Sequence, residues 1–245
     1  QSGMGEVPLR DVSLLGNPIY RYKMGVRKSK PSAEVTCEKF QLRFKKDSIC
    51  EFLSYAVGRI LGRYRLHHEG VCTKAAELSN EIHDDYYAID NIVILSRNYE
   101  NNLMDRFCLF LCKVYGKETL DENLAFIGQF LCSDKSPKDA IQDFFENDFY
   151  AFHLKMYKNC PIYWQIESPG NHAFRALFYI HRYSAEIWSV LLNQYLPRMC
   201  AYSDSHDIEM FKRSLQKIVQ SRPEMDMDLG IQYHYRRFED ILSPI

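Results

Sequence analysis

The chain has 245 residues, of which 46% are hydrophobic and 14% aromatic, and its formal net charge at pH 7 is −1. A chain of this length can bury a substantial core, and its aromatic content excludes a disordered protein. A near-neutral chain has no global field that would draw it to nucleic acid or to an anionic membrane, so any such surface must be local. No apolar run approaches the roughly 20 residues of a membrane span, so we expect no membrane partner.

The eight cysteines are scattered along the chain, at positions 37, 50, 72, 108, 112, 132, 160 and 200. A protein of this size does not need a disulfide framework, so we expect reduced thiols and a cytoplasmic location. The first three residues, Gln-Ser-Gly, resemble the remnant of a cleaved tag, and we leave them out of the fold prediction.

Charge divides the chain into regions. Residues 1–48 contain ten Lys or Arg and five Asp or Glu, whereas residues 117–148 contain eight acids and three bases. Residues 1–45 show no helical period and are interrupted by turn sequences at 16–18 and 30–32. We therefore predict a basic, partly extended segment over 1–45, followed by a mainly helical domain over 46–245.

The first expected elements are a strand and a long helix. Alternating apolar and polar residues predict a short strand over 40–44. A helix is expected from a cap at Asp47 to about Leu66, because apolar residues recur at helical spacing from Ile49 onward. Gly58 and Gly62 lie four apart in this helix, a spacing that would let another backbone approach closely.

The remaining elements are mostly helical. We expect helices over 103–115, 120–131, 137–145, 149–156, 184–196 and 207–220, with a capping box at Thr119 and Glu122 and a cap at Ser136 before Pro137. Turn chemistry at 167–171 separates two β-prone runs and predicts an antiparallel hairpin over 161–183. A short strand is expected at 231–235. The predicted fold class is α+β, predominantly helical, with a small antiparallel hairpin.

A catalytic site is not expected in this chain. Asn17-Pro-Ile-Tyr20 is close to the Asn-Pro-Pro-Tyr loop of amino-methylating enzymes, in which an aromatic ring stacks on the flipped base. However, no glycine-rich loop follows a strand nearby to hold S-adenosylmethionine, and an isolated four-residue match has little weight. Nucleophile-elbow and phosphate-loop motifs are also missing from the sequence.

A metal site is not expected either. Cys108 and Cys112 have helical spacing but apolar neighbours, which favours core packing over zinc binding. His67 and His68 follow a helix end near Cys72, where a solvated turn is favoured over a transition-metal site. Asp84 and Asp85 are adjacent and point in different directions, so this pair alone cannot chelate one ion.

Basic and aromatic residues alternate over 153–183. Cations there would neutralise phosphates, and aromatic rings would stack on bases or hold arginine side chains, which is typical of nucleic-acid binding. The alternative is a hairpin whose aromatic residues form core and whose cations are solvated. The residues by themselves leave both interpretations open.

Several ordered segments resemble one family. Leu53-Ser-Tyr-Ala-Val-Gly-Arg-Ile-Leu-Gly-Arg-Tyr64 is similar to a signature of the large BREX-type (PglX-like) adenine-specific DNA methyltransferases. Further similar segments follow in order: 90–93, 116–127, 136–141, 148–157, 161–164, 179–183 and 228–235. Together they span about 45–245, with the family's catalytic motif and cofactor loop lying upstream of the matched region.

The resemblance implies a part of an S-adenosylmethionine-dependent enzyme that methylates adenine N6 in DNA within a phage-defence or restriction-modification system. We expect a non-catalytic, DNA-engaging module that needs no cofactor itself and whose partners are double-stranded DNA, the upstream methyltransferase domain and other BREX proteins. The alternative is a protein–protein docking scaffold, and a third hypothesis is an enzyme in its own right. The candidate DNA contacts are Arg59, Arg63, Arg65, Lys155, Lys158, Arg175, His181 and Arg182.

Overall fold

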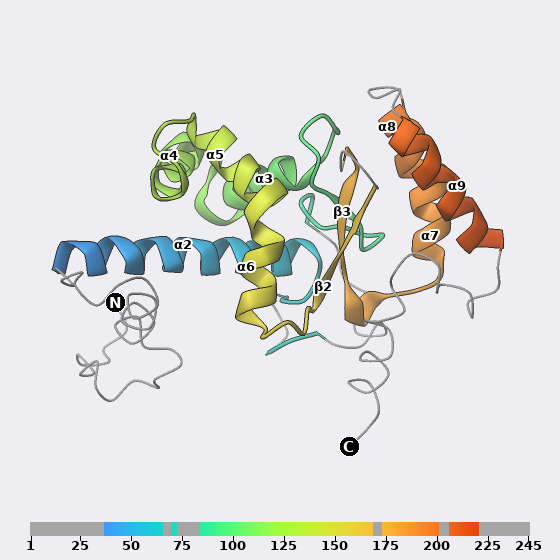
Figure 1. The fold of residues 1–245 in the computed structure, drawn as a ribbon. Helices are drawn as coiled ribbons and strands as arrows, with labels where there is room; N and C mark the ends of the chain where they lie inside the picture. The colour runs from blue at the N-terminus through green and yellow to red at the C-terminus, as the bar shows by residue number, and fades with distance from the viewer. Residues whose placement is uncertain (1–36, 66–69, 73–83, 169–172, 201–205, 221–245) are drawn as a thin grey trace, which may run out of the picture.

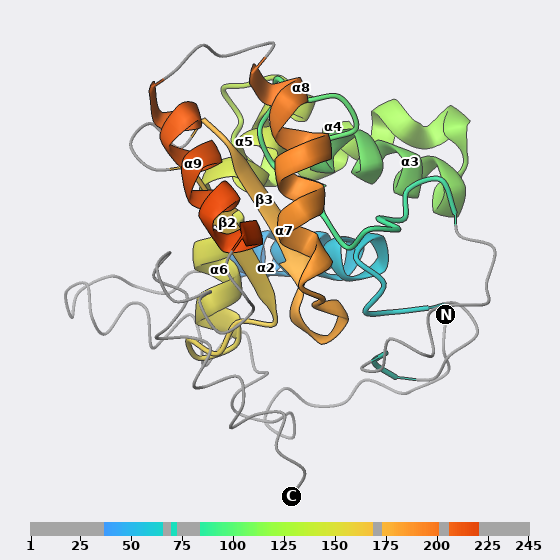
Figure 2. The ribbon, with the colours of Figure 1, turned by 90° about the vertical axis from the view of Figure 1, so that its right-hand side faces the viewer.

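The computed structural model describes residues 37–65, 70–72, 84–168, 173–200 and 206–220. A three-stranded antiparallel sheet lies between two groups of helices (Figures 1 and 2). The helices within residues 37–156 lie on one side of the sheet, and those within residues 186–220 lie on the other. The predicted α+β, mainly helical fold class is therefore confirmed.

Helix α2, Cys37–Ile60, is the first element that the structure describes. The expected strand at 40–44 is wrong, because these residues lie inside this helix. Five alternating residues without a turn signal are too few to fix a strand, and the helix continues through them. The helix also crosses residue 45, the expected boundary of the N-terminal segment. The predicted helix end near Leu66 is wrong too, since α2 ends at Ile60.

Gly62 ends α2 in a left-handed conformation, with φ +80°. The Arg63 N–H donates to the Gly58 carbonyl at 2.7 Å, and the Gly62 N–H donates to the Arg59 carbonyl at 3.2 Å. This pair of bonds is a Schellman motif, which satisfies carbonyls at the helix end. Gly62 thus terminates the helix instead of forming part of its surface.

Gly58 makes room for aromatic rings and not for a backbone, which corrects the expectation for the glycine pair. A Cβ at this position would lie 2.5 Å from the ring of Tyr64 and 2.8 Å from the hydroxyl of Tyr163. Tyr163 is fully buried. The glycine therefore brings the end of α2 into close contact with the first strand of the hairpin.

The next helices form a compact group beside α2. They are α3 (Leu103–Tyr115), α4 (Leu120–Leu131), α5 (Pro137–Asp143) and α6 (Phe149–Met156), with a short 3-10 turn at Lys117–Thr119 and a π-helical turn at Phe144–Asp148 that links α5 to α6. The Ser136 cap is confirmed, because its side chain accepts from the Asp139 N–H. The capping box at Thr119 is wrong, because the Thr119 hydroxyl donates to carbonyls of the preceding turn instead.

The predicted hairpin is confirmed as β2 (Tyr163–Glu167) and β3 (Arg175–Tyr179). A third strand, β1 (Val93–Ile94), pairs antiparallel with the other edge of β3. A strand of two residues is too short to leave an alternating apolar and polar pattern in the sequence. Asn91 extends this edge with its side chain: its Oδ1 accepts from the Tyr179 N–H at 3.0 Å, and its Nδ2 donates to the Tyr179 carbonyl at 2.9 Å.

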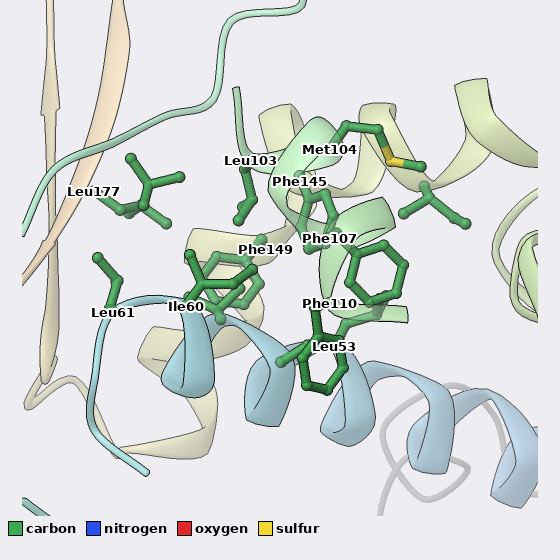
Figure 3. Close-up of a cluster of buried hydrophobic side chains, with 14 of the residues drawn as sticks. Leu53, Ile60, Leu61, Leu103, Met104, Phe107, Phe110, Phe145, Phe149 and Leu177 are labelled. Carbon is green, nitrogen blue, oxygen red and sulfur yellow. The ribbon is translucent and has the colours of Figure 1, made fainter. Parts of the chain in front are cut away.

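The sheet separates two hydrophobic clusters because successive side chains of β3 point to opposite faces. Leu177 and Tyr179 belong to the first cluster, with residues of α2, α3 and α6. Ala176 and Phe178 belong to the second, with residues of α7, α8 and α9. Figure 3 shows the first cluster, in which Leu53 and Ile60 of α2 lie near phenylalanines of the neighbouring helices.

The second layer contains α7 (Glu186–Val190), a π-helical turn (Leu191–Tyr195), α8 (Leu196–Cys200) and α9 (His206–Gln220). The helix expected over 184–196 was predicted to stop before Pro197, but the helical stretch continues through this residue into α8. Proline removes an N–H and crowds the preceding turn, and the wider π-helical turn accommodates both effects. The prediction for α9 is confirmed. The expected strand at 231–235 lies outside the described residues.

Candidate nucleic-acid interface

Arg63 lies directly after α2 and contacts tyrosines from two parts of the chain. Its guanidinium carbon is 5.0 Å from the ring centroid of Tyr64 and 5.2 Å from that of Tyr157. Its Nη1 donates to the Tyr157 hydroxyl at 2.6 Å. The Tyr64 ring in turn contacts Tyr55 of α2, with centroids 5.2 Å apart and planes inclined by 30°. We call Tyr55, Arg63, Tyr64 and Tyr157 the Tyr–Arg cluster.

Tyr157, the member of the Tyr–Arg cluster next to α6, contacts a buried histidine. The His153 ring lies 4.7 Å from that of Tyr157 and 4.8 Å from that of Tyr163. His153 Nε2 accepts from the N–H groups of Ile162 and Tyr163, at 3.0 and 3.2 Å. Burial, aided by the positive charge of Arg63, lowers the pKa of His153 to about 3, so its ring is neutral near pH 7. It joins α6 to the start of β2.

Arg65 and Arg182 share a second tyrosine, Tyr87. The guanidinium carbon of Arg182 is 4.9 Å from the Tyr87 ring centroid, and that of Arg65 is 6.0 Å from it. Arg182 also donates to the carbonyls of Leu61, Ala88 and Ile89, at 3.0, 2.9 and 2.8 Å. These bonds tie the turn after β3 to the end of α2. Burial lowers the pKa of Arg182, whose hydrogen bonds serve the fold.

Lys155 and Lys158 lie at the C-terminal end of α6, on either side of Tyr157, and both are exposed. Lys158 adopts a positive φ of 52° as the chain turns towards β2. His181 lies in the turn after β3, with its ring 5.2 Å from that of Tyr179. Burial, together with the charge of Arg63, lowers the pKa of His181.

Two of the candidate residues have other surroundings. Arg59 is only 7% exposed, and its Nη2 donates to the Tyr86 hydroxyl at 2.8 Å inside the first cluster. Arg175 lies at the far end of β3 from His181, where its Nη1 donates to the Glu146 carbonyl at 2.6 Å and to Asn147 Oδ1 at 3.1 Å. The structure thus gives Arg59 a place in the core and Arg175 a place between β3 and the π-helical turn.

The structure therefore gathers six of the eight candidates around the end of α2. Arg63 and Arg65 follow this helix, Lys155 lies in the last turn of α6 with Lys158 just after it, and His181 and Arg182 follow β3 (Figure 1). Sequence reasoning missed the rings that contact these arginines, Tyr64 and Tyr87, and the Tyr55 ring that packs against Tyr64. A signal was present, because Tyr64 lies directly between Arg63 and Arg65, but the partners of such rings come from distant parts of the chain.

The described part of the chain contains neither a metal-binding cluster nor a membrane-spanning helix. No group of three or more His, Cys, Asp or Glu side chains there is arranged to hold a metal ion. Cys108 packs against the first hydrophobic cluster, and Asp84 forms an ion pair with Lys113 at 3.2 Å. His67 and His68 lie outside the described residues. Among the helices of the described segments, none is both long and apolar enough to span a membrane.

The chain matches no protein-family model. It is 28% identical to the adenine-specific methyltransferase BrxX of Escherichia coli O9:H4 (strain HS), over 282 aligned positions that cover 96% of this chain and 23% of that protein. It is 31% identical to the adenine-specific methyltransferase PglX of Lacticaseibacillus casei (strain Zhang), over 152 positions that cover 59% of this chain and 13% of that protein. The chain is a homologue of the BREX adenine-specific methyltransferases.

The resemblance found in the sequence is thereby confirmed. The chain spans less than a quarter of the length of these BREX relatives. Both relatives are named as adenine-specific methyltransferases. Whether the residues gathered at the end of α2 bind DNA stays a prediction.

Proposed function

We propose that this chain is a non-catalytic, DNA-engaging module of an S-adenosylmethionine-dependent, adenine-N6-specific DNA methyltransferase of the BREX type. The observation that carries the proposal is the gathering of basic and aromatic side chains from three elements around the end of α2. Cations that neutralise phosphates supply most of the affinity of non-specific DNA binding. Adenine chemistry and cofactor binding would belong to another part of the enzyme.

Lys155 and Lys158 are the best-placed phosphate contacts in this proposal. Both are exposed, and Tyr157 between them contacts Arg63. Arg63, Arg65 and Arg182 would contribute charge from sites where they already contact tyrosine rings. Arg59 is the least suitable phosphate contact, because it is only 7% exposed and donates a hydrogen bond to a core tyrosine.

The test is fluorescence anisotropy with a labelled 20-base-pair duplex at several salt concentrations. Affinity should fall steeply with salt, with a log–log slope of about −0.9 for each phosphate contact. The double variant Lys155→Ala, Lys158→Ala should weaken binding and make this slope less steep by about 1.8 if each lysine neutralises one phosphate.

The matched control is the double variant Lys117→Ala, Lys138→Ala, which removes the same charge. Both lysines are exposed, and Lys138 lies at the start of the α5–α6 helical stretch, about 25 Å along it from Lys155 at 1.5 Å per residue. If the two double variants weaken DNA binding equally, Lys155 and Lys158 act only through the net charge of the protein and not as phosphate contacts. An absence of binding even at low salt would refute the proposal.

A second candidate function is docking onto the catalytic part of the enzyme or onto another BREX protein. It is favoured by exposed apolar side chains on α3 and α4, among them Val114 at 50%, Tyr115 at 50% and Phe126 at 55% exposure. Co-purification with the upstream part of the enzyme tests it. Phe126→Ser should reduce co-purification if this surface is the docking site, and it should leave DNA affinity unaltered.

A further inference from the structure

We infer that the exposed ring of Tyr55 is a stacking platform for an unpaired nucleobase of a DNA strand. This inference rests on the proposed function and specifies which form of DNA the module would prefer. It concerns the outer end of the Tyr–Arg cluster, where one aromatic side chain of α2 stands on the surface.

The exposure of Tyr55 is the first observation. Its side chain lies in a helix whose neighbouring residues Ser54 and Ala56 are buried, yet it is itself 45% exposed. One side of its ring is covered by Tyr64, with centroids 5.2 Å apart and planes inclined by 30°. A large ring that is supported on one side and accessible on another is the arrangement on which bases stack in proteins that bind single strands.

The rigidity of the support is the second observation. Tyr64 packs against Gly58, where a Cβ would lie only 2.5 Å from its ring. Arg63 contacts the Tyr64 ring and is held by its 2.6 Å bond to the Tyr157 hydroxyl. Tyr157 rests on His153, which is completely buried. Because these groups are ordered before a ligand arrives, binding would lose little side-chain entropy.

Charge selects the class of ligand. The cluster combines tyrosine rings with Arg63, and Lys155 and Lys158 flank Tyr157 at its other end. A flat aromatic ring that carries a phosphate matches this combination, whereas a purely apolar peptide side chain does not use the cations. Glu51 lies one helical turn before Tyr55 and would repel phosphate. The strand is therefore expected to leave Tyr55 towards α6.

The experiment uses the whole chain and two duplexes of equal length. One carries a single unpaired 2-aminopurine as a bulge, and the other is fully paired with 2-aminopurine at the same position. Stacking predicts a preference of about tenfold for the bulged duplex, within the range found for one base on one aromatic ring. It also predicts that 2-aminopurine fluorescence changes on binding in the bulged duplex alone.

Tyr55→Ala should abolish the preference and the fluorescence change, whereas Tyr55→Phe should keep both because it retains the ring. Leu109→Ala removes another helical apolar side chain of similar exposure, 41%, and should keep both signals. Thermal melting checks that each variant is folded.

Four outcomes would overturn the inference. If the unaltered chain binds both duplexes equally, or if Tyr55→Ala retains the preference, Tyr55 is not the platform and the proposed DNA-engaging function survives. If Tyr55→Ala instead reduces only co-purification with the upstream enzyme, the ring is a protein contact. If neither duplex binds at low salt, the proposed function and this inference fail together.

Discussion

Acidification should destabilise this protein through His153. The ring is completely buried, and its Nε2 accepts two backbone N–H groups, so the proton of the neutral ring must lie on Nδ1. Protonating Nε2 would break both bonds and place a charge among Tyr150, Tyr157 and Tyr163, close to Arg63. The folded state therefore resists a proton that the unfolded chain accepts.

The sign and size of this pH effect follow from the pKa values of His153 in the folded and unfolded states. Burial lowers the pKa of His153 from 6.5 to about 3 in the folded protein. Between these values the unfolded state binds more protons, so the free energy of unfolding rises with pH. The contribution is complete above pH 6.5 and is lost as pH falls, by up to about 1.4 kcal/mol per unit. At pH 5 the loss should reach about 2 kcal/mol.

The assay is urea unfolding followed by circular dichroism at half-unit steps from pH 7.5 to pH 4.5. His153→Gln is the matched variant, since its amide oxygen can still accept an N–H but does not titrate in this range. It should be less stable at pH 7.5 and should show a shallower dependence on pH. His206, an exposed residue at the start of α9, supplies the control His206→Gln, which should follow the unaltered chain. An equally steep pH dependence in His153→Gln would refute the reasoning.

Two further predictions concern the backbone around the sheet and the end of α2. Asn91→Ala should lower the free energy of unfolding by about 2–4 kcal/mol, because it leaves the N–H and carbonyl of Tyr179 without their partner. Asn91→Gly, which tolerates the positive φ, should remain destabilised, and full stability of this variant would contradict the assigned role. Gly62→Ala should be destabilised more than Gly70→Ala: both glycines have positive φ, but only at Gly62 would the Cβ meet a ring, that of Tyr87 at 2.8 Å. Equal melting temperatures for the two variants would show that this ring moves aside freely.

Much of the helical layout could be predicted from the sequence because its signals are local. The apolar stripe and terminal Gly116 marked α3, Ser136 and Pro137 marked the start of α5, and turn chemistry after Glu167 marked the hairpin. Local signals failed where they were short or ambiguous. Five alternating residues over 40–44 suggested a strand within α2, and the two-residue β1 left no pattern at all.

The sequence by itself determined the family relationship, the mainly helical class and the basic residues worth testing. Only the tertiary structure decided which of those residues lie together, since the partners of Arg63 and Arg182 are far from them along the chain. Tyr157 lies 94 residues from Arg63, and the Leu61 carbonyl lies 121 residues from Arg182. The physical reason is that burial and ring contact depend on which faces of α2, α6 and β3 pack against one another. That packing withdrew Arg59 into the core and left Tyr55 on the surface.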